Sequence, residues 1–509
     1  MVEIDGAQLT IPEVVAVSRS GEQARLSNVA RQRMEQSRCW VEEIVAAQQP
    51  VYGINTGFGV FADRSISPQD SARLNRNLIL SHSVATGPAL QNEIVRATML
   101  IRANTLASGY SGVRPLLADT LLEMLNKRVV PSVPSQGSLG SSGDLAPLSH
   151  LALVFTCDEN DYDGESGVAD YGGKQLSGKQ AMQQAGISRL ILGAKEGLAI
   201  TNGATFSAAI AALAVADAIH LLSVAEITLA MSLEALLGVS SAFDPRLHEA
   251  RRHPGQMFVA SRVIHLIQDS TLINPVGKVQ DAYSLRCAPQ VQGAARDAAA
   301  HVHNVITREI NAATDNPLLF EQDVAISGGN FHGEPVGMAM DFLSIAMAEV
   351  GAISERRIFR LTDAKLNSGL PPMLVDHATD AGLNSGMMMP QYTAASLVLE
   401  NQTLASPDSI HSLPTSAEQE DHNANAMTAA RNARLIIENT AHILAIEAYC
   451  AARALDLRLR EMPGARMGVG VQTAHKKVRN QVAYQAGDAL WGPEIEQVQR
   501  LILQPDFLE

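Results

Sequence analysis

The chain has 509 residues, with 39 Lys and Arg against 53 Asp and Glu, which gives a formal net charge of −14. Such an acidic chain lacks the positive surface that binding to nucleic acid or to an anionic membrane requires, so we expect neither partner. Hydrophobic residues make up 46% of the sequence and charged residues 18%, which excludes a disordered chain. Aromatic residues make up only 4%, which favours closely packed helices of Ala, Leu, Val, Ile and Met over a β-sandwich.

The cysteines and the N-terminus indicate a cytoplasmic protein. The four cysteines are scattered and form no CxxC pair: Cys39, Cys157, Cys287 and Cys450. We therefore expect neither a disulfide framework nor a thiolate metal site, as is typical of a reducing compartment. The first residues, MVEIDGAQLTIPEV, carry acids and lack a basic region followed by an apolar run, so no signal peptide is predicted.

The N-terminal third alternates between helical patterns and clusters of glycine, serine and proline. These clusters predict loops at residues 52–59, 108–115 and 130–147, because such residues favour turns over regular structure. Apolar residues at helical spacing predict helices over residues 91–107 and 116–127.

The rest of the chain is dominated by long helical patterns. A polar, glycine-rich stretch at residues 157–175 predicts a surface excursion or a small hairpin. Helices are then expected over residues 204–237, 290–312, 335–361, 388–405 and 424–458. We predict a mainly α protein in which residues 1–200 form an N-terminal domain of mixed helices and loops, and residues 201–509 form a long central and C-terminal helical bundle.

The composition of the long helices also bears on whether the chain spans a membrane and whether it forms an oligomer. Residues 197–216 carry no charge and are long enough to span a membrane. They include Asn202 and are followed directly by Asp217, so a buried bundle helix is the favoured interpretation. Because a monomer could not easily cover so much Ala and Leu surface with so few charges, we expect a homo-oligomer.

The most unusual segment is GSLGSSGDLAPLSH at residues 137–150. The simplest interpretation is a flexible loop that enters a helix, with Asp144 as the N-cap. A phosphate-binding loop is excluded, since no lysine adjoins the glycines. A chemical interpretation is that the backbone nitrogen of Gly143, which lacks a Cβ, attacks the carbonyl of Ser141. If Ser142 then loses water, the product is a five-membered ring with an electrophilic methylidene.

This segment resembles the signature of the aromatic amino acid ammonia-lyases and their aminomutase relatives, which form the cofactor 4-methylidene-imidazol-5-one (MIO) from Ala-Ser-Gly. The resemblance implies the helical ammonia-lyase fold and an MIO formed from Ser141-Ser142-Gly143. It extends over nearly the whole chain, through Tyr52–Gly59 (YGINTGFG), Lys195–Gly203 (KEGLAITNG), Gln280–Gln290 (QDAYSLRCAPQ), Asn316-Pro317, Gly328–His332 (GGNFH) and Ser354–Arg357 (SERR).

The resemblance also implies roles for individual residues. Tyr52 is expected to remove the β-proton, for which its pKa would have to be lowered by a nearby cation or dipole. Arg286 is expected to bind the substrate carboxylate, and Asn202 and Tyr283 to orient the cofactor and the amine. Two further residues, Gln280 and Phe331, are expected to line the site.

Within the family, the chain is most similar to the members that act on histidine. Ser81-His82 stands where tyrosine lyases have His-Leu and phenylalanine lyases have Phe-Leu, and 419–422 (QEDH) replaces their Asn-Gln-Asp. A substrate imidazole needs a charged or polar partner, which Glu420 with His82 can supply. The implied reaction is elimination of ammonia from L-histidine to give trans-urocanate, in a homotetramer whose sites draw residues from three chains.

Departures from the family pattern leave the substrate and the outcome open. Ser141 replaces Ala, residues 202–205 are Asn-Gly-Ala-Thr, residues 287–289 are Cys-Ala-Pro, and residues 423–427 are Asn-Ala-Asn-Ala-Met. Alternative substrates are tyrosine and N-methylated or thiolated histidine. An alternative outcome is a 2,3-aminomutase, which returns ammonia to the β-carbon, and a non-catalytic homologue is a third interpretation.

Taken singly, the site residues also have ordinary structural explanations. Tyr52 could be a packing anchor, Arg286 a buried paired arginine, and His82 a helix-capping or core histidine. Glu420 could belong to a solvated charge run. A metal is not expected, because the histidines that end His248–His253 are five residues apart and do not share one helix face.

Overall fold

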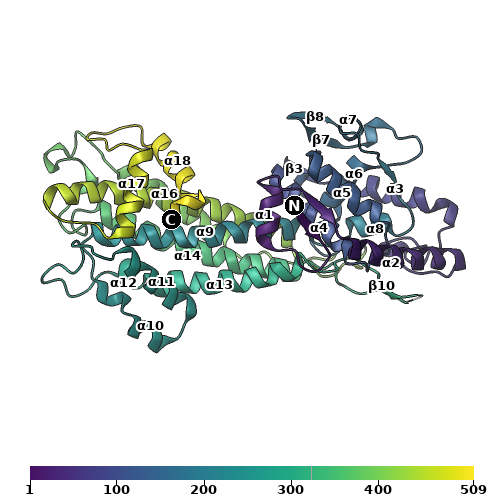
Figure 1. The fold of residues 1–509 in the computed structure, drawn as a ribbon, viewed down its shortest axis with the longest axis horizontal. Helices are drawn as coiled ribbons and strands as arrows, with labels where there is room; N and C mark the ends of the chain where they lie inside the picture. The colour runs from purple at the N-terminus through teal and green to yellow at the C-terminus, as the bar shows by residue number, and fades with distance from the viewer. Residues whose placement is uncertain (323, 509) are drawn as a thin grey trace. The chain divides into compact units, whose positions relative to one another are not determined.

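The computed structural model describes residues 1–322 and 324–508, and it divides into two compact units (Figure 1). Unit 1 comprises Met1–Ala216, Val302–Asp341 and Pro407–Arg431, and unit 2 comprises Asp217–His301, Phe342–Ser406 and Asn432–Glu509. Eighteen α-helices lie in the described residues and the chain is 59% helical, so the mainly α fold is confirmed. The domain boundary expected at residue 200 stays a prediction, since the contacts group three separate stretches of chain into each unit.

Unit 1 holds the shorter helices. They are α1 (Ile11–Ser18), α2 (Asn28–Ala47), α3 (Ser71–His82), α4 (Asn92–Ala107), α5 (Pro115–Lys127), α6 (Leu145–Phe155), α7 (Gly178–Gln184) and α8 (Glu196–Thr201). Their starts follow local chemistry, because Thr10 and Glu13 form a capping box at α1 and the Ser27 hydroxyl caps α2. Helix α4 is buried almost along its whole length, which makes it the central helix of the unit.

Small sheets tie the loops of unit 1 together. The pairs are β1 (Val2–Ile4) with β2 (Ala24–Leu26), β3 (Thr86–Ala89) with β5 (Pro134–Gln136), β6 (Thr156–Cys157) with β9 (Leu190–Ile191), and β10 (Leu318–Glu321) with β11 (Val324–Ile326), while β4 (Val130–Pro131), β7 (Val168–Tyr171) and β8 (Lys174–Ser177) form one sheet. The pairing of Thr86 with Gln136 positions two parts of the candidate site, because it holds the segment after His82 against the start of the loop at 137–143.

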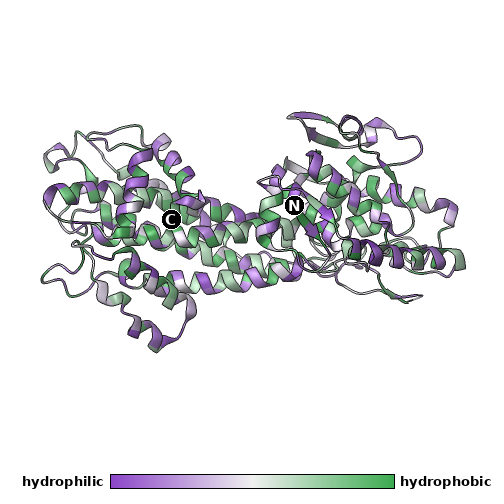
Figure 2. Cartoon of the chain, viewed as in Figure 1, coloured by the Kyte–Doolittle hydropathy of each residue, from purple (hydrophilic) through white to green (hydrophobic). Residues whose placement is uncertain are grey.

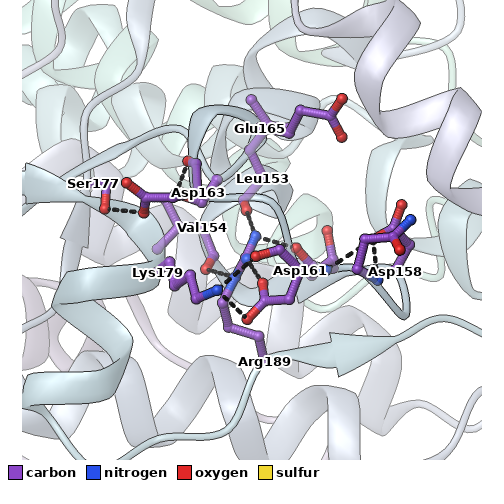
Figure 3. A network of polar contacts seen from close by, with 12 residues as sticks. Leu153, Val154, Asp158, Asp161, Asp163, Glu165, Ser177, Lys179 and Arg189 are labelled. Atoms are coloured by element: carbon purple, nitrogen blue, oxygen red, sulfur yellow. Dashed lines mark hydrogen bonds and ion pairs between the residues drawn. The ribbon is translucent and has the colours of Figure 1, made fainter.

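The polar stretch at 157–175 contains part of a hairpin, as predicted, with β7 and β8 joined through Gly172-Gly173. One acidic residue before the hairpin, Asp161, is held by two cations (Figure 3). Arg189 forms an ion pair with Asp161 and donates to the Leu153 carbonyl at 2.8 Å, and Lys179 Nζ donates to the Asp161 carbonyl at 2.7 Å. These contacts fix the excursion to the helices beneath it.

The long helices expected from the sequence are present. Four of them contribute residues to both units: α9 (Thr205–Ala235), α13 (Ala288–Glu309), α14 (Glu334–Thr362) and α16 (Ala426–Glu461). Unit 2 also holds α10 (Pro245–Arg251), α11 (Pro254–Leu266), α12 (Tyr283–Arg286), α15 (Met388–Leu404), α17 (Val469–Gln481) and α18 (Trp491–Ile502). Hydrophobic and hydrophilic residues interleave along α13 (Figure 2), as expected of a helix with one buried stripe, whereas α9 is mostly hydrophobic and buried at nearly every position.

Helices α9 and α14 are long and apolar enough to span a membrane by length and composition. In each, 72% of the most apolar window is buried inside the protein, which favours the core-helix interpretation made for this part of α9. All four cysteines are free, and Cys157 and Cys450 are buried.

Candidate active site

A pocket of about 1090 Å³ in unit 1 gathers most of the site residues predicted from the sequence. Its lining includes Tyr52, His82, Ser141, Ser142, Asn202, Phe331 and Glu420. These residues come from segments far apart in the sequence, so the fold brings them together. Gln280, Tyr283 and Arg286 belong to unit 2 and are not among the lining residues.

The loop at 137–143 is held by a close approach of two glycines. Gly143 has φ +81°, and a Cβ on it would lie 2.1 Å from the carbonyl carbon of Gly203. The Gly203 N–H donates to the Ser142 carbonyl at 3.2 Å, and the Asp144 N–H donates to the Gly203 carbonyl at 2.9 Å. Only glycine fits this backbone contact, so Gly143 is required by geometry as well as by the predicted chemistry.

Asn202 provides a second hydrogen bond to the Ser142 carbonyl. Its Nδ2 donates to the Ser142 carbonyl at 2.9 Å. Its Oδ1 is buried and accepts no hydrogen bond from any described residue, although Asn202 lines the pocket. A buried acceptor of this kind is suited to an N–H group of a bound ligand, because leaving it unpaired is costly.

In the tripeptide Ser141-Ser142-Gly143, both serine hydroxyls donate to one carboxylate, that of Glu420. Ser141 Oγ donates to Glu420 Oε2 at 2.8 Å, and Ser142 Oγ donates to Glu420 Oε1 at 2.7 Å. Ser141 is buried, with 5% of its surface exposed. Glu420 was expected to contact a substrate ring, and its direct contact with the tripeptide was not anticipated from the sequence.

The loop that carries Glu420 has an unusual backbone. Residues 416–418 (Ser, Ala and Glu) all have φ between 52° and 68°, which is rare for residues with a side chain. The turn is closed by Thr415, whose N–H donates to the Glu420 carbonyl at 2.8 Å and whose carbonyl accepts from the Glu420 N–H at 3.2 Å. The left-handed turn therefore presents Glu420 to the pocket.

Tyr52 lies in the loop that follows α2. The adjoining Gly53 has φ +72°, and a Cβ there would lie 2.7 Å from Leu198 Cδ2, so the loop packs tightly against α8. The cation or dipole expected to lower the Tyr52 pKa is not among the influences on Tyr52 within this single chain, apart from one backbone N–H. Burial raises the pKa of Tyr52, an N–H of Gly59 opposes the shift, and the nearby Glu420 carboxylate raises it further.

His82 is the last residue of α3, and its Nδ1 lies 3.0 Å from Ser81 Oγ. Burial lowers the pKa of His82, while the Leu78 carbonyl and the Glu420 charge oppose the shift. The lowered pKa favours the neutral ring, which can present one nitrogen as donor and the other as acceptor.

Asp144 occupies the predicted N-cap position of α6, and its carbonyl accepts from the Leu148 N–H at 3.0 Å. Its side chain, however, makes no capping hydrogen bond to that helix. Its carboxylate accepts from Ser207 N at 2.8 Å and Ser207 Oγ at 2.9 Å in the first turn of α9, and from Ser138 Oγ at 2.7 Å. Asp144 thus caps α9, because the free N–H groups of that helix face its buried side chain.

Buried charged residues hold the segments that line the pocket. Lys195 and Asp315 form a fully buried ion pair, and Asp315 Oδ1 also accepts from the N–H of Asn316, a pocket residue, at 2.6 Å. Arg102 is fully buried, and burial lowers its pKa to about 10. Its Nη1 donates to the Ala199 carbonyl at 3.3 Å, which ties α4 to α8. Lys195 was predicted to belong to a motif, but no role was predicted for it.

Two histidines and a carboxylate were also missed as pocket residues. His332 and His422 stack with ring centroids 5.8 Å apart. The Glu334 N–H donates to His332 Nδ1 at 3.3 Å, so His332 Nε2 carries the proton and donates to the His422 carbonyl at 3.2 Å. Glu334 Oε2 is buried and has no partner among the described residues. In the sequence, only the motif at residues 328–332 pointed to a pocket residue in this group, His332.

The site residues of unit 2 are presented outward. Tyr283 is 69% exposed on α12, and the Arg286 guanidinium lies over its ring, 4.6 Å from the centroid. Gln280 is also exposed. Arg286 Nε is buried and has no partner among the described residues. Tyr283 and Gln280 are thus exposed side chains of unit 2, whereas Arg286 is half-buried.

The tripeptide fits the predicted cyclisation. The Gly143 N–H, the expected nucleophile, donates no hydrogen bond to any described residue, while the Ser142 carbonyl between the reacting groups is fixed by Asn202 and Gly203. Among the described residues, no group of three or more His, Cys, Asp or Glu side chains is arranged to hold a metal ion.

Comparison with known proteins decides the family. The sequence profile of the aromatic amino acid lyases matches residues 9–480. The chain belongs to the aromatic amino acid lyase family. It is 46% identical over 511 residues to a histidine ammonia-lyase of Alkaliphilus oremlandii (strain OhILAs), covering 100% of this chain and 98% of that protein.

Solved structures of this lyase family share the fold. Histidine ammonia-lyase from Trypanosoma cruzi matches with a TM-score of 0.89 and 37% identity over 98% of this chain and 93% of that chain. Tyrosine aminomutase from Streptomyces globisporus matches with a TM-score of 0.92 and 34% identity over 100% and 97%. The ammonia-lyase type of fold expected from the sequence is thereby confirmed.

Proposed function

We propose that this aromatic amino acid lyase eliminates ammonia from L-histidine to give trans-urocanate. Its 46% identity to a histidine ammonia-lyase over the whole chain supports this reaction. The observation that carries the proposal is the arrangement at Ser142, whose carbonyl is held by Asn202 and whose hydroxyl lies on Glu420. One pocket thus contains both Ser142, a serine that can lose water, and Glu420, a carboxylate that can bind an imidazole ring.

We propose that MIO forms autocatalytically from Ser141-Ser142-Gly143. The Gly143 N–H, which donates no hydrogen bond to any described residue, and the glycine contact described above support ring closure, since a sharp bend is required and no Cβ can be accommodated. When formed, the group supplies an electrophilic methylidene carbon that takes up the substrate amine and so makes ammonia a better leaving group.

The pocket residues supply the remaining contacts. The unpaired Oδ1 of Asn202 is suited to accept from the substrate amine. Glu420 can accept a hydrogen bond from the imidazole N–H, and the neutral ring of His82 can pair with the other ring nitrogen. We assign removal of the β-proton to Tyr52, and its raised pKa means that the phenolate must be stabilised when the site is complete.

Completion of the site requires a second chain in this proposal. Tyr283 and Gln280 are exposed on unit 2, so a neighbouring subunit can receive them, and the half-buried Arg286 has an unpaired Nε among the described residues. Arg286 would bind the carboxylate through its guanidinium, Tyr283 would orient the amine, and Gln280 and Phe331 would line the site. We propose a cytoplasmic homotetramer with shared active sites.

The test is incubation of the purified protein with L-histidine, L-tyrosine, L-phenylalanine and N-methylated or thiolated histidine. The proposal predicts that histidine alone gives conjugated acrylate absorbance together with one equivalent of ammonia. Conversion of another substrate without turnover of histidine would contradict it. The match to a tyrosine aminomutase makes a β-amino acid the competing product, which chromatography of the reaction mixture would identify.

A further inference from the structure

The two oxygens of Glu420 are engaged unequally. Oε2 accepts from Ser141 Oγ at 2.8 Å and from Thr415 Oγ1 at 3.3 Å. Oε1 accepts only from Ser142 Oγ, at 2.7 Å, among the described residues. One oxygen is therefore held twice, by the tripeptide and by its own loop, and the other depends on a single serine.

Cofactor formation consumes these donors unequally. In the proposed cyclisation, the Gly143 nitrogen bonds to the Ser141 carbonyl carbon. That carbonyl oxygen leaves as water with the N–H protons of Gly143 and Ser142, and a double bond forms between the Ser141 carbon and the Ser142 nitrogen. Ser142 loses its Oγ with the proton from its Cα as a second water, which leaves a carbon–carbon double bond. The Ser141 hydroxyl takes part in neither step, so it remains when the Ser142 hydroxyl has gone.

We propose that Ser141 is a positioning residue for Glu420, which holds Oε2 in the mature site so that Oε1 faces the substrate ring. This inference rests on the proposed function, because it assigns the ring contact to one atom of the same carboxylate. An alanine at position 141 would leave Oε2 with Thr415 alone, at the longer distance of 3.3 Å.

The surrounding loop explains why a second tether is needed. Residues 416–418, next to Glu420, hold left-handed backbone angles, which are strained for residues with a side chain. Asn423, with 1% exposed surface, closes the loop by accepting from the Leu413 N–H at 3.0 Å, and the Asn425 N–H donates to the Leu139 carbonyl at 2.8 Å. The backbone ends are fixed, but the Glu420 side chain is oriented chiefly by the tripeptide.

The first test measures ligand binding without the cofactor. Ser142→Ala cannot dehydrate, and it removes the hydroxyl that occupies Oε1, as maturation would. Isothermal titration with imidazolepropionate, the saturated counterpart of the product, should show binding to this variant. Adding Ser141→Ala should weaken binding about tenfold, the size expected for one hydrogen bond to a charged group. Adding Ser141→Thr instead should keep the affinity.

A double-mutant cycle distinguishes positioning from a general structural effect. In the Ser142→Ala background, Ser141→Ala should have little further effect once Glu420→Gln has removed the charge, because the two side chains act as one unit. Equal affinity with and without Ser141→Ala, or an undiminished effect beside Glu420→Gln, would overturn the inference. The cycle decides the question even if the threonine variant does not fold.

Turnover separates this inference from the proposed function. The otherwise wild-type Ser141→Ala protein should still lose two waters by intact mass and should show a higher KM for histidine, with kcat changed less. If the wild type converts histidine and Ser141→Ala leaves KM unchanged, the positioning role is wrong while the proposed function stands. If the wild type fails to convert histidine, the proposed function fails instead.

Discussion

Gly143 and Gly203 approach so closely that a Cβ on Gly143 would lie 2.1 Å from the Gly203 carbonyl carbon and 2.3 Å from its nitrogen. Because Gly203 also donates to the Ser142 carbonyl, this contact sets the bend of the tripeptide. We therefore expect Gly203 to be needed for the proposed ring closure, although it contributes no atom to the ring.

We predict that Gly203→Ala blocks the loss of water. Its Cβ would lie 2.6 Å from Thr314 Oγ1 and 2.8 Å from Arg102 Nη2, at φ +118°. The matched control is Gly172→Ala in the β7–β8 turn, where φ is +63° and no atom lies within 4 Å. The control should mature fully and lose only about 1 kcal/mol of stability. Intact mass spectrometry checks both, and full water loss in Gly203→Ala would contradict the prediction.

Glu234 gives unit 2 a stability that depends on pH. Burial raises the pKa of Glu234 to about 7, opposed by the Gly468 N–H, which donates to its Oε1 at 2.9 Å. Because the folded state binds the proton more tightly than the unfolded chain, this stability is present below pH 4.5 and is lost as the pH rises through about 7.

Glu234→Gln should remove this pH dependence, since glutamine resembles the protonated acid. Relative to the wild type, its stability should increase from pH 5 to pH 8 by up to about 3 kcal/mol. Thermal unfolding of both proteins at matched pH values measures the change. A constant difference in Tm across this range would show that Glu234 does not titrate as described.

Glu447 is the centre of a buried polar cluster in unit 2. It accepts from Arg357 Nε at 2.5 Å and Nη2 at 2.7 Å, and from the hydroxyls of Ser354 at 2.6 Å and Ser232 at 2.7 Å. The side chains of Arg357 and Glu447 are both fully buried. Removing one charge of such a pair leaves the other uncompensated, which is strongly destabilising.

Glu447→Gln is therefore expected to lower the free energy of unfolding by about 3–5 kcal/mol. The control is Asp119→Asn, which breaks the half-exposed pair between Arg31 and Asp119 and should cost less than about 1 kcal/mol. Denaturant unfolding of the two variants against the wild type provides the comparison. Similar losses in both would contradict the importance assigned to the buried pair.

Shared active sites predict complementation between inactive variants. Tyr52→Phe and Tyr283→Phe should each abolish most of the activity, since one tyrosine lies in the pocket and the other on unit 2. If the two come from different chains in each site, refolding the variants together should produce some sites with both tyrosines intact. Recovered turnover supports the shared site, and persistent inactivity in confirmed mixed oligomers would contradict it.

Much of this pocket could be predicted because its residues lie in recognisable motifs. Tyr52, Ser142, Asn202 and Glu420 were each identified from the sequence and line one cavity. The contact of Ser141 with Glu420 could not be foreseen, since the residues are 279 positions apart and no local pattern records such a pair.

The remaining differences also arise from tertiary structure. Asp144 stands at the start of α6, where a cap is expected, but the fold places the first turn of α9 beside its carboxylate. A lowered Tyr52 pKa was expected from the chemistry of a base, yet burial and the Glu420 charge raise it. Helix lengths follow local patterns, whereas burial and charge depend on segments that meet only in the folded chain.

The central claim is that Ser142 dehydrates to form the electrophile that acts on histidine. The most direct measurement is the intact mass of the purified wild type beside Ser142→Ala, with histidine turnover assayed on the same samples. We expect the wild type to lack two waters and to release ammonia and urocanate, and the variant to keep its full sequence mass and be almost inactive. A wild type of full sequence mass that still converts histidine would contradict the account.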